Sequence, residues 1–127
     1  MTKRNLFLLG VLILAQLVYA GNWDDTKAQA KQENKLILLK FSGSDWCGPC
    51  IQLQKVIFDD PVFEQFAHDK LVLFKADFPR LKKNQLPKEQ QAINDQLAET
   101  YNPEGEFPCM VLIDAQGSTL RKWHGYD

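Results

Sequence analysis

The apolar positions of the chain fall into short blocks that predict strands separated by helices. Residues 23–34 are polar and rich in helix formers, which predicts a helix that Asp24 or Asp25 caps and that Asn34 ends. Residues 36–41 are almost continuously apolar, as is typical of a central strand covered on both faces. Shorter apolar runs at 71–77 and 109–113 predict two further buried strands.

Three stretches with helical spacing lie between these strands. The first runs from Cys47 to about Phe58, the second begins at Pro61, and the third ends at Asn102-Pro103. In the first two, we expect these apolar residues to face the core: Ile51, Val56, Ile57, Val62, Phe63, Phe66 and Ala67. A turn at 115–118 followed by alternating residues predicts an antiparallel edge strand. This order of elements predicts an α/β protein with a three-layer sandwich.

The first 20 residues have the features of a secretory signal peptide. Lys3 and Arg4 precede an apolar run at 6–18, and Val18-Tyr19-Ala20 places small residues at the −3 and −1 positions. The run of about 13 residues is short for a membrane span, which needs about 20, although an uncleaved N-terminal anchor is the alternative. We therefore expect a periplasmic or secreted protein whose folded domain spans residues 21–127.

Length and charge limit the classes of function. At 127 residues the chain is expected to form one domain, and we expect a monomer. Its net charge of −1 comes from acidic and basic residues that are mixed along the chain, so no nucleic-acid partner is expected. An exported protein meets an oxidising compartment, where paired cysteines are redox-active or disulfide-bonded. The chain has three cysteines, so one needs a separate explanation.

Cys47 and Cys50 are two residues apart and lie where the first strand gives way to a helix. This context favours a redox pair over half of a metal site. The first turn of a helix has unpaired N–H groups and the positive end of the helix dipole, which stabilise a thiolate and lower the pKa of a cysteine there. Cys47 is therefore the candidate nucleophile and Cys50 the resolving thiol.

The cysteine pair has two other possible roles. A purely structural disulfide would close a tight ring that constrains little of the chain and so stabilises little. A structural zinc site needs four ligands, usually in paired motifs, and the remaining Cys109, His68 and His124 have no such spacing. We expect no metal and no cofactor, and we expect both histidines to be solvated.

The residues around the pair resemble the thioredoxin superfamily. Trp46-Cys47-Gly48-Pro49-Cys50 matches the thioredoxin motif at every position, and Phe107-Pro108 opens a later strand where the family has a cis-proline. Gly43-Ser44-Asp45 before the motif and Phe58-Asp59-Asp60-Pro61 after it are similar to exported bacterial thioredoxin-like proteins, including the C-terminal domain of DsbD-type thiol:disulfide interchange proteins. The resemblance extends from about Trp23 to Tyr126 and implies a thioredoxin-like α/β/α sandwich with a mixed sheet.

The resemblance also implies a function and a site. It implies an exported thiol–disulfide oxidoreductase that reduces protein disulfides. Cys47 and Cys50 would form its redox-active disulfide, and a membrane-bound donor would keep this pair reduced. The residues expected to shape the site and contact substrate are Trp46, Gly48, Pro49, Phe107 and Pro108. There are two alternatives. The protein is a disulfide oxidase or isomerase with the same fold, or it is a binding module with a non-catalytic disulfide.

The chain departs from the family pattern at three places. Lys40 and Phe41 stand near the position of the family's buried aspartate, so that carboxylate is missing. Cys109 follows the family proline where threonine is common, and it is a buried inert thiol, a third redox thiol or a thiol that pairs with another molecule. The family's last helix is missing before Asp127, because the chain dispenses with it or the sequence is truncated, and we expect some apolar sheet surface to be uncovered. Asp45 is expected either to tune the thiolate or to be solvated.

Overall fold

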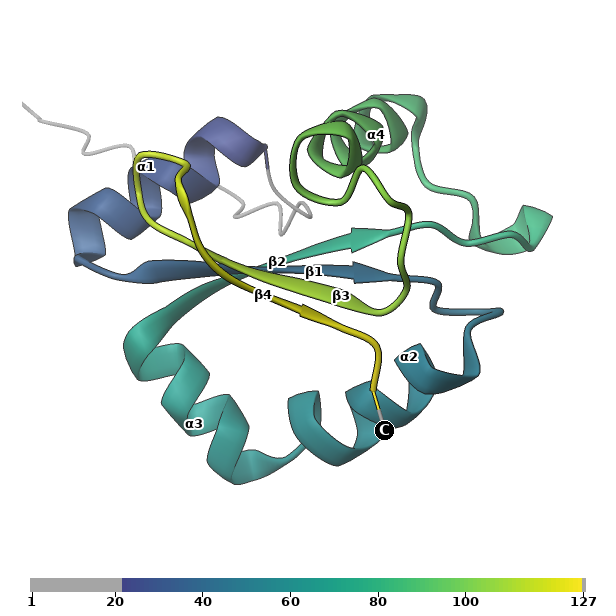
Figure 1. Cartoon of the computed structure of the whole chain (residues 1–127), viewed down its shortest axis with the longest axis horizontal. Coiled ribbons are helices and arrows are strands. Elements are labelled where there is room, and N and C mark those ends of the chain that lie inside the picture. The colour runs from purple at the N-terminus through teal and green to yellow at the C-terminus, as the bar shows by residue number, and fades with distance from the viewer. Residues whose placement is uncertain (1–21, 127) are drawn as a thin grey trace, which may run out of the picture.

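A mixed sheet organises residues 22–126, the part of the chain that the computed structural model describes (Figure 1). Its strands are β1 (Leu36–Ser42), β2 (Leu71–Asp77), β3 (Cys109–Ile113) and β4 (Thr119–His124). They lie in the order β2-β1-β3-β4, with β1 parallel to β2 and antiparallel to β3, and with β3 antiparallel to β4. The predicted mixed sheet is confirmed, and the segment after the turn at 115–118 is its edge strand.

Helices cover both faces of the sheet. They are α1 (Trp23–Glu33), α2 (Gly48–Leu53), α3 (Pro61–Lys70) and α4 (Lys88–Tyr101), with a π-helical turn η1 (Gln54–Phe58) and a 3₁₀ turn η2 (Lys82–Asn84). The helices α1 and α4 lie on one face, and α2, η1 and α3 lie on the other (Figure 1). This confirms the predicted three-layer sandwich. None of the helices between residues 22 and 126 has both the length and the apolar character that a membrane crossing needs.

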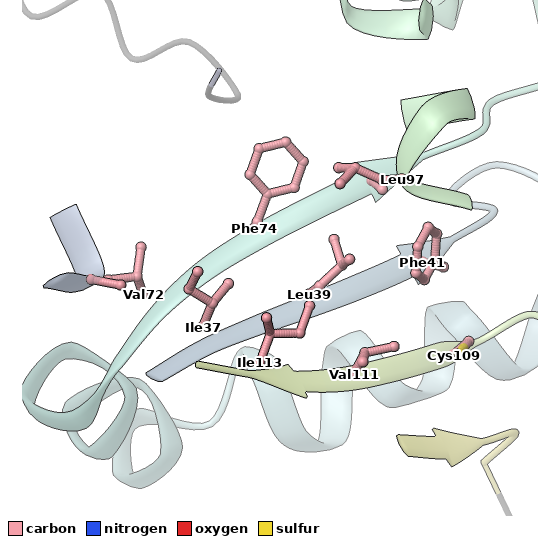
Figure 2. Packing of buried hydrophobic residues seen from close by; sticks show 11 residues of the cluster. Ile37, Leu39, Phe41, Val72, Phe74, Leu97, Cys109, Val111 and Ile113 are labelled. Atoms are coloured by element: carbon pink, nitrogen blue, oxygen red, sulfur yellow. The ribbon is translucent and has the colours of Figure 1, made fainter. Parts of the chain in front are cut away.

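The main core lies between the sheet and the layer of α1 and α4. Ile37, Leu39 and Phe41 of β1 point into it together with Val111 of β3, and all four are fully buried (Figure 2). The intervening Leu38 faces the opposite layer, where Leu53 and Phe58 pack against it. Strand β1 is therefore apolar at successive positions because it is central and both of its faces are covered.

Side-chain caps fix where the helices begin. Asn22 caps α1, since its side chain accepts a hydrogen bond from the Asp24 amide, so the prediction that Asp24 or Asp25 caps this helix was wrong. Asn34 ends α1 in the left-handed conformation, as predicted. Asp60 caps α3 through the amides of Val62 and Phe63.

Four apolar residues expected in the core are exposed instead. Ile51, Val56, Val62 and Phe66 have 38%, 51%, 80% and 53% of their surface accessible. A π-helical turn has i→i+5 hydrogen bonds in place of the i→i+4 bonds of an α-helix. At η1 the buried residues are therefore Leu53 and Phe58, which are five residues apart. The prediction holds for Ile57, Phe63 and Ala67, which are partly or fully buried.

An apolar hollow lies on the sheet face that α2 and α3 only partly cover. Its walls include Leu38 and Leu112 from the sheet, Phe63 and Phe66 from α3, and Trp123 from the edge strand. Trp123 is 37% exposed and Phe66 more so. This is the uncovered apolar sheet surface that the sequence predicts.

Lys40 is the only charged side chain that is buried within residues 22–126, with 6% of its surface exposed. Its Nζ donates a hydrogen bond to Gln54 and lies 3.9 Å from the centre of the Phe58 ring. Burial first, and then the charge of Lys75, lower the pKa of Lys40 to about 8. No aspartate or glutamate is buried in this part of the chain, so a buried carboxylate is absent, as the sequence indicates.

We expect Lys40→Met to raise the free energy of unfolding at pH 7 by about 1–2 kcal/mol, because removing a desolvated charge outweighs losing the bond to Gln54. Below pH 8 the lysine is charged in both the folded and unfolded chains and the cost is complete. Between pH 8 and 10.5 the unfolded chain holds the proton that the folded chain has released, so the parent gains stability as the pH rises.

Urea unfolding of the oxidised protein at pH 7 and at about pH 9.5 measures this effect. The advantage of Lys40→Met should shrink at the higher pH, whereas Lys55→Met, at an exposed lysine of η1, should change little at either pH. An advantage of the same size at both pH values, or none at pH 7, would contradict the assigned cost.

Candidate redox site

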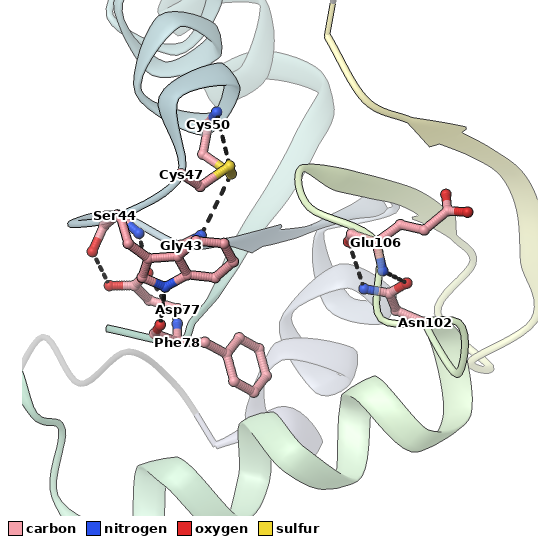
Figure 3. Close-up of a disulfide and its surroundings, with 9 residues drawn as sticks. Gly43, Ser44, Cys47, Cys50, Asp77, Phe78, Asn102 and Glu106 are labelled. Carbon is pink, nitrogen blue, oxygen red and sulfur yellow. Dashed lines mark hydrogen bonds between the residues drawn. A yellow bond between two sulfur atoms is a disulfide. The ribbon is translucent and has the colours of Figure 1, made fainter. Parts of the chain in front are cut away.

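Cys47 and Cys50 are joined by a disulfide at the beginning of α2, with their Cα atoms 5.2 Å apart (Figure 3). Cys47 is the N-cap residue, and its sulfur accepts a hydrogen bond from the Cys50 amide at 3.3 Å. The amide of Gly43 lies 3.5 Å from the sulfur of Cys50. The chain leaves β1 at Ser42, so the disulfide lies at the carboxyl end of a central strand, where backbone N–H groups point at the sulfur atoms.

Both cysteines are buried in this oxidised state. Cys47 is 5% exposed and Cys50 is 3% exposed. The reason is that the side chain of Cys47 folds back over its own helix to reach Cys50 and the Cys50 amide. Gly48 and Pro49, which open the helix, are exposed.

The ring of Trp46 joins the cysteine motif to two distant parts of the chain. Its Nε1 donates a hydrogen bond of 2.7 Å to the carbonyl of Phe78, and its ring packs edge-on against Phe107 with 5.4 Å between centroids. The Phe107–Pro108 peptide bond is cis, as the resemblance implies. The structure thus brings Phe107 and Pro108 to the motif although they are about 60 residues away along the sequence.

Gly43 is required by the close approach of the same ring. A Cβ atom placed on Gly43 would lie 2.3 Å from an atom of the Trp46 indole, closer than real side chains come. The glycine therefore lets the ring lie flat against the backbone that follows β1.

Two aspartates exchange hydrogen bonds between the loop of the motif and the segment after β2. The carboxylate of Asp77 accepts from both the amide and the hydroxyl of Ser44 (Figure 3). In the opposite direction, Asp45 accepts from the amides of Arg80 and Leu81 at 2.9 and 3.0 Å. We call this pair of contacts the aspartate exchange.

The aspartate exchange settles the role of Asp45. Its carboxylate also accepts a bond of 3.0 Å from the side chain of Asn84, and these bonds, the Arg80 amide first, hold the pKa of Asp45 below its usual value. Asp45 therefore ties two loops together. The sequence does not reveal this role, because the partners are about 35 residues apart along the chain and two of the three donors are backbone amides.

Buried asparagines fix the segments that lead to the site. Asn94 of α4 donates to the carbonyl of Asp77 at 3.0 Å. Asn102 donates to the carbonyl of Glu106 and accepts from its amide, which fixes the turn just before Phe107 (Figure 3). The sequence identifies Asn102 only as a helix end.

The remaining candidate residues are Cys109 and the two histidines. Cys109 is fully buried in the main core, and burial raises the pKa of its thiol to about 11 (Figure 2). The expected burial of this thiol is confirmed, and its raised pKa keeps the thiol protonated near neutral pH. His68 is exposed beside Asp69, and His124 is exposed and pairs with Glu106. Within residues 22–126, no group of three or more metal-ligating side chains is placed to hold a metal ion.

The fold and the site define a thioredoxin-like protein, with a cysteine pair where β1 gives way to α2 and a cis-proline beside it. A family model described as Thioredoxin-like matches residues 18–115, and the chain belongs to this family. The chain is 42% identical over 93 residues to the disulfide bond reductase DsbH of Chlamydia pneumoniae. The aligned residues make up 73% of this chain and 54% of that protein. The chain therefore spans about half the length of this curated relative.

Solved structures give the same answer for the fold. A DsbH oxidoreductase matches with a TM-score of 0.74 and 35% identity, over 84% of this chain and 74% of that chain. The C-terminal domain of Neisseria meningitidis DsbD in the oxidised form matches with a TM-score of 0.50 and 20% identity, over 81% and 79% of the two chains. The resemblance seen in the sequence is thus confirmed, with DsbD sharing the fold alone.

We expect Asp45→Ala to lower the urea midpoint at pH 7, because three donors of the segment after β2 lose their acceptor. Hydrogen exchange of the Arg80 and Leu81 amides should become faster. Since the folded pKa of Asp45 lies below 3.8, its contribution is complete near neutral pH and is lost as the pH falls below 3.8.

Glu99→Ala, an exposed position on α4, serves as the matched control and should leave both measurements unchanged. A midpoint for Asp45→Ala equal to that of the parent at pH 7, with unchanged exchange at Arg80 and Leu81, would show that Asp45 does not hold the segment.

Proposed function

We propose that this protein is an exported thiol–disulfide oxidoreductase that reduces disulfides of other proteins. The observation that carries the proposal is the Cys47–Cys50 disulfide at the beginning of α2, with backbone amides directed at its sulfur atoms. Membership of the Thioredoxin-like family and 42% identity to a disulfide bond reductase support it. A disulfide that closes only three residues of sequence adds little stability, which favours a chemical role over a structural one.

The reaction is thiol–disulfide exchange in two steps. The thiolate of reduced Cys47 attacks one sulfur of the substrate disulfide, a Cys47–substrate bond forms, and the other substrate sulfur leaves as a thiolate that takes up a proton. The Cys50 thiolate then attacks the sulfur of Cys47, closes the internal disulfide and releases the second substrate thiol. Two electrons pass to the substrate, and the protein is left in the oxidised state described above.

Residues around the pair have positioning roles in this proposal. Gly48 and Pro49 are exposed beside the disulfide and are available to a docking substrate. Trp46 covers the backbone next to Cys47, and its contact with Phe107 brings the cis-proline segment to the site. We assign to the backbone of Phe107 the pairing with an extended substrate segment, a form of β-strand addition.

The cellular setting is part of the same proposal. The predicted signal peptide, residues 1–20, lies outside the described residues, and its composition supports export to the periplasm or beyond. The oxidised pair must be reduced again by a donor dithiol, which we assign to a membrane-bound protein, since an oxidising compartment lacks a reducing thiol pool. We propose that the chain works as a monomer.

We expect Cys47→Ser to lower the reduction of insulin disulfides to the uncatalysed rate, because the attacking sulfur is removed. Cys50→Ser should still attack but should stall as a mixed disulfide on Cys47, because nothing resolves it. Turbidity measures the reduction, and non-reducing gels with mass spectrometry show the trapped species.

Equal turnover by Cys47→Ser and the parent would leave only a binding module with a non-catalytic disulfide. Equilibration of the parent with glutathione buffers then separates a reductant from an oxidase or isomerase. A potential near −270 mV, as in thioredoxin, supports reduction, and one near −180 mV or above favours the alternative.

We expect Cys109→Ala to reduce insulin within about twofold of the parent rate, because a buried thiol with a pKa of about 11 is neutral at working pH and cannot attack. The smaller side chain leaves a small cavity, so a modest loss of stability is expected. A collapse of activity in a variant whose circular dichroism and urea midpoint remain close to those of the parent would make the thiol a participant.

A further inference from the structure

The segment between β2 and α4 carries a concentration of positive charge. Residues 78–88, here called the basic segment, contain Arg80, Lys82, Lys83 and Lys88 and no acidic residue, in a chain whose net charge is −1. All four cations are exposed. None of them pairs with a carboxylate in the part of the chain that the structure describes. Their charge is therefore available to an outside partner.

The basic segment is held beside the disulfide. Asp45, two residues before Cys47, accepts hydrogen bonds from the Arg80 and Leu81 amides, and Trp46 donates to the carbonyl of Phe78. The carboxylate of Asp45 is occupied by these donors and by Asn84, so it is bound to the backbone of the segment rather than to its cationic side chains. The backbone that carries these charges is thus tied to the loop of the cysteine motif.

Arg80 contacts the cysteine motif directly. Its guanidinium lies 3.7 Å from the ring centroid of Trp46, the residue before Cys47. The side chain donates no hydrogen bond to any residue between 22 and 126. A guanidinium stacked in this way keeps its N–H groups at the edge of the ring, where a carboxylate can accept from two of them at once.

We propose that the basic segment recognises protein substrates whose disulfide is flanked by aspartate or glutamate. The inference rests on the proposed reductase function and adds a substrate class to it. Carboxylates of the substrate meet Arg80 on Trp46 while the neighbouring disulfide meets Cys47, and Lys82 and Lys83 add attraction at longer range. Electrostatic complementarity of this kind raises the rate of association and is weakened by salt.

Two synthetic peptides test the proposal. Both have the same sequence and one internal disulfide, and they differ only in carrying two glutamates or two glutamines beside it. The reduced protein is mixed with each peptide at low ionic strength, and the second-order rate of reduction is measured. Each rate is divided by that with dithiothreitol, because flanking acids change the reactivity of the peptide disulfide itself.

The parent should reduce the glutamate peptide about fivefold faster than the glutamine peptide, within the range that electrostatic steering produces. This ratio should fall below about two in Lys82→Gln/Lys83→Gln, in Arg80→Gln, and for the parent at about 0.5 M salt. The control Lys31→Gln/Lys70→Gln removes the same charge as the double variant, at the ends of α1 and α3 that precede β1 and β2, and should keep the parent ratio.

The outcomes separate this inference from the function on which it rests. Equal rates for the two peptides with the parent overturn the substrate preference and leave the reductase function standing, whereas reduction of neither peptide overturns both. A preference that persists unchanged in all variants of the basic segment overturns its assignment to these residues. The proposal would also be overturned if the two peptides react at equal rates and the parent binds vesicles containing about 30% phosphatidylglycerol, with this binding lost in Lys82→Gln/Lys83→Gln. The basic segment would then be a binding site for a membrane surface.

Discussion

The hydrogen bonds that Asp45 and Asp77 exchange are the constraint on which the site depends. Asp77, at the end of β2, accepts from the motif loop, and Asp45 of that loop accepts from the segment after β2, so neither segment can move without breaking bonds on both sides. Hydrogen bonds to charged acceptors are stronger than neutral ones. They hold the loop of the cysteine motif against the segment after β2, and they thereby set where Trp46 and the disulfide lie.

The sheet supplies the rigid base for this arrangement. Strand β1 is buried on both faces and delivers the chain to Gly43, while its parallel neighbour β2 delivers Asp77 to the same edge. Antiparallel β3 begins beside Phe107 and Pro108, so three strands meet where the disulfide lies. Lys40, buried in the middle of β1, is a cost to stability within this base, because its charge is desolvated and has only Gln54 and the Phe58 ring as partners.

Patterns that are local in sequence could be predicted, and contacts between distant loops could not. The apolar run at 36–41, the cysteine motif and the Phe107-Pro108 pair led to the fold, the disulfide and the cis-proline. The exposure of Val56 was missed because helical periodicity assumes an α-helix, and the π-helical turn shifts the buried positions by one residue. The role of Asp45 was missed because its carboxylate accepts hydrogen bonds from backbone amides, and every residue except proline has one.

The contact between Gly43 and the indole of Trp46 has a consequence for how this family can vary. Any side chain at position 43 would occupy the space of the ring, so a larger residue there requires a smaller one at position 46 or a different path for the loop. The two positions are therefore not independent. Across related proteins we expect them to covary, with glycine at the first wherever the second is tryptophan held flat against the backbone.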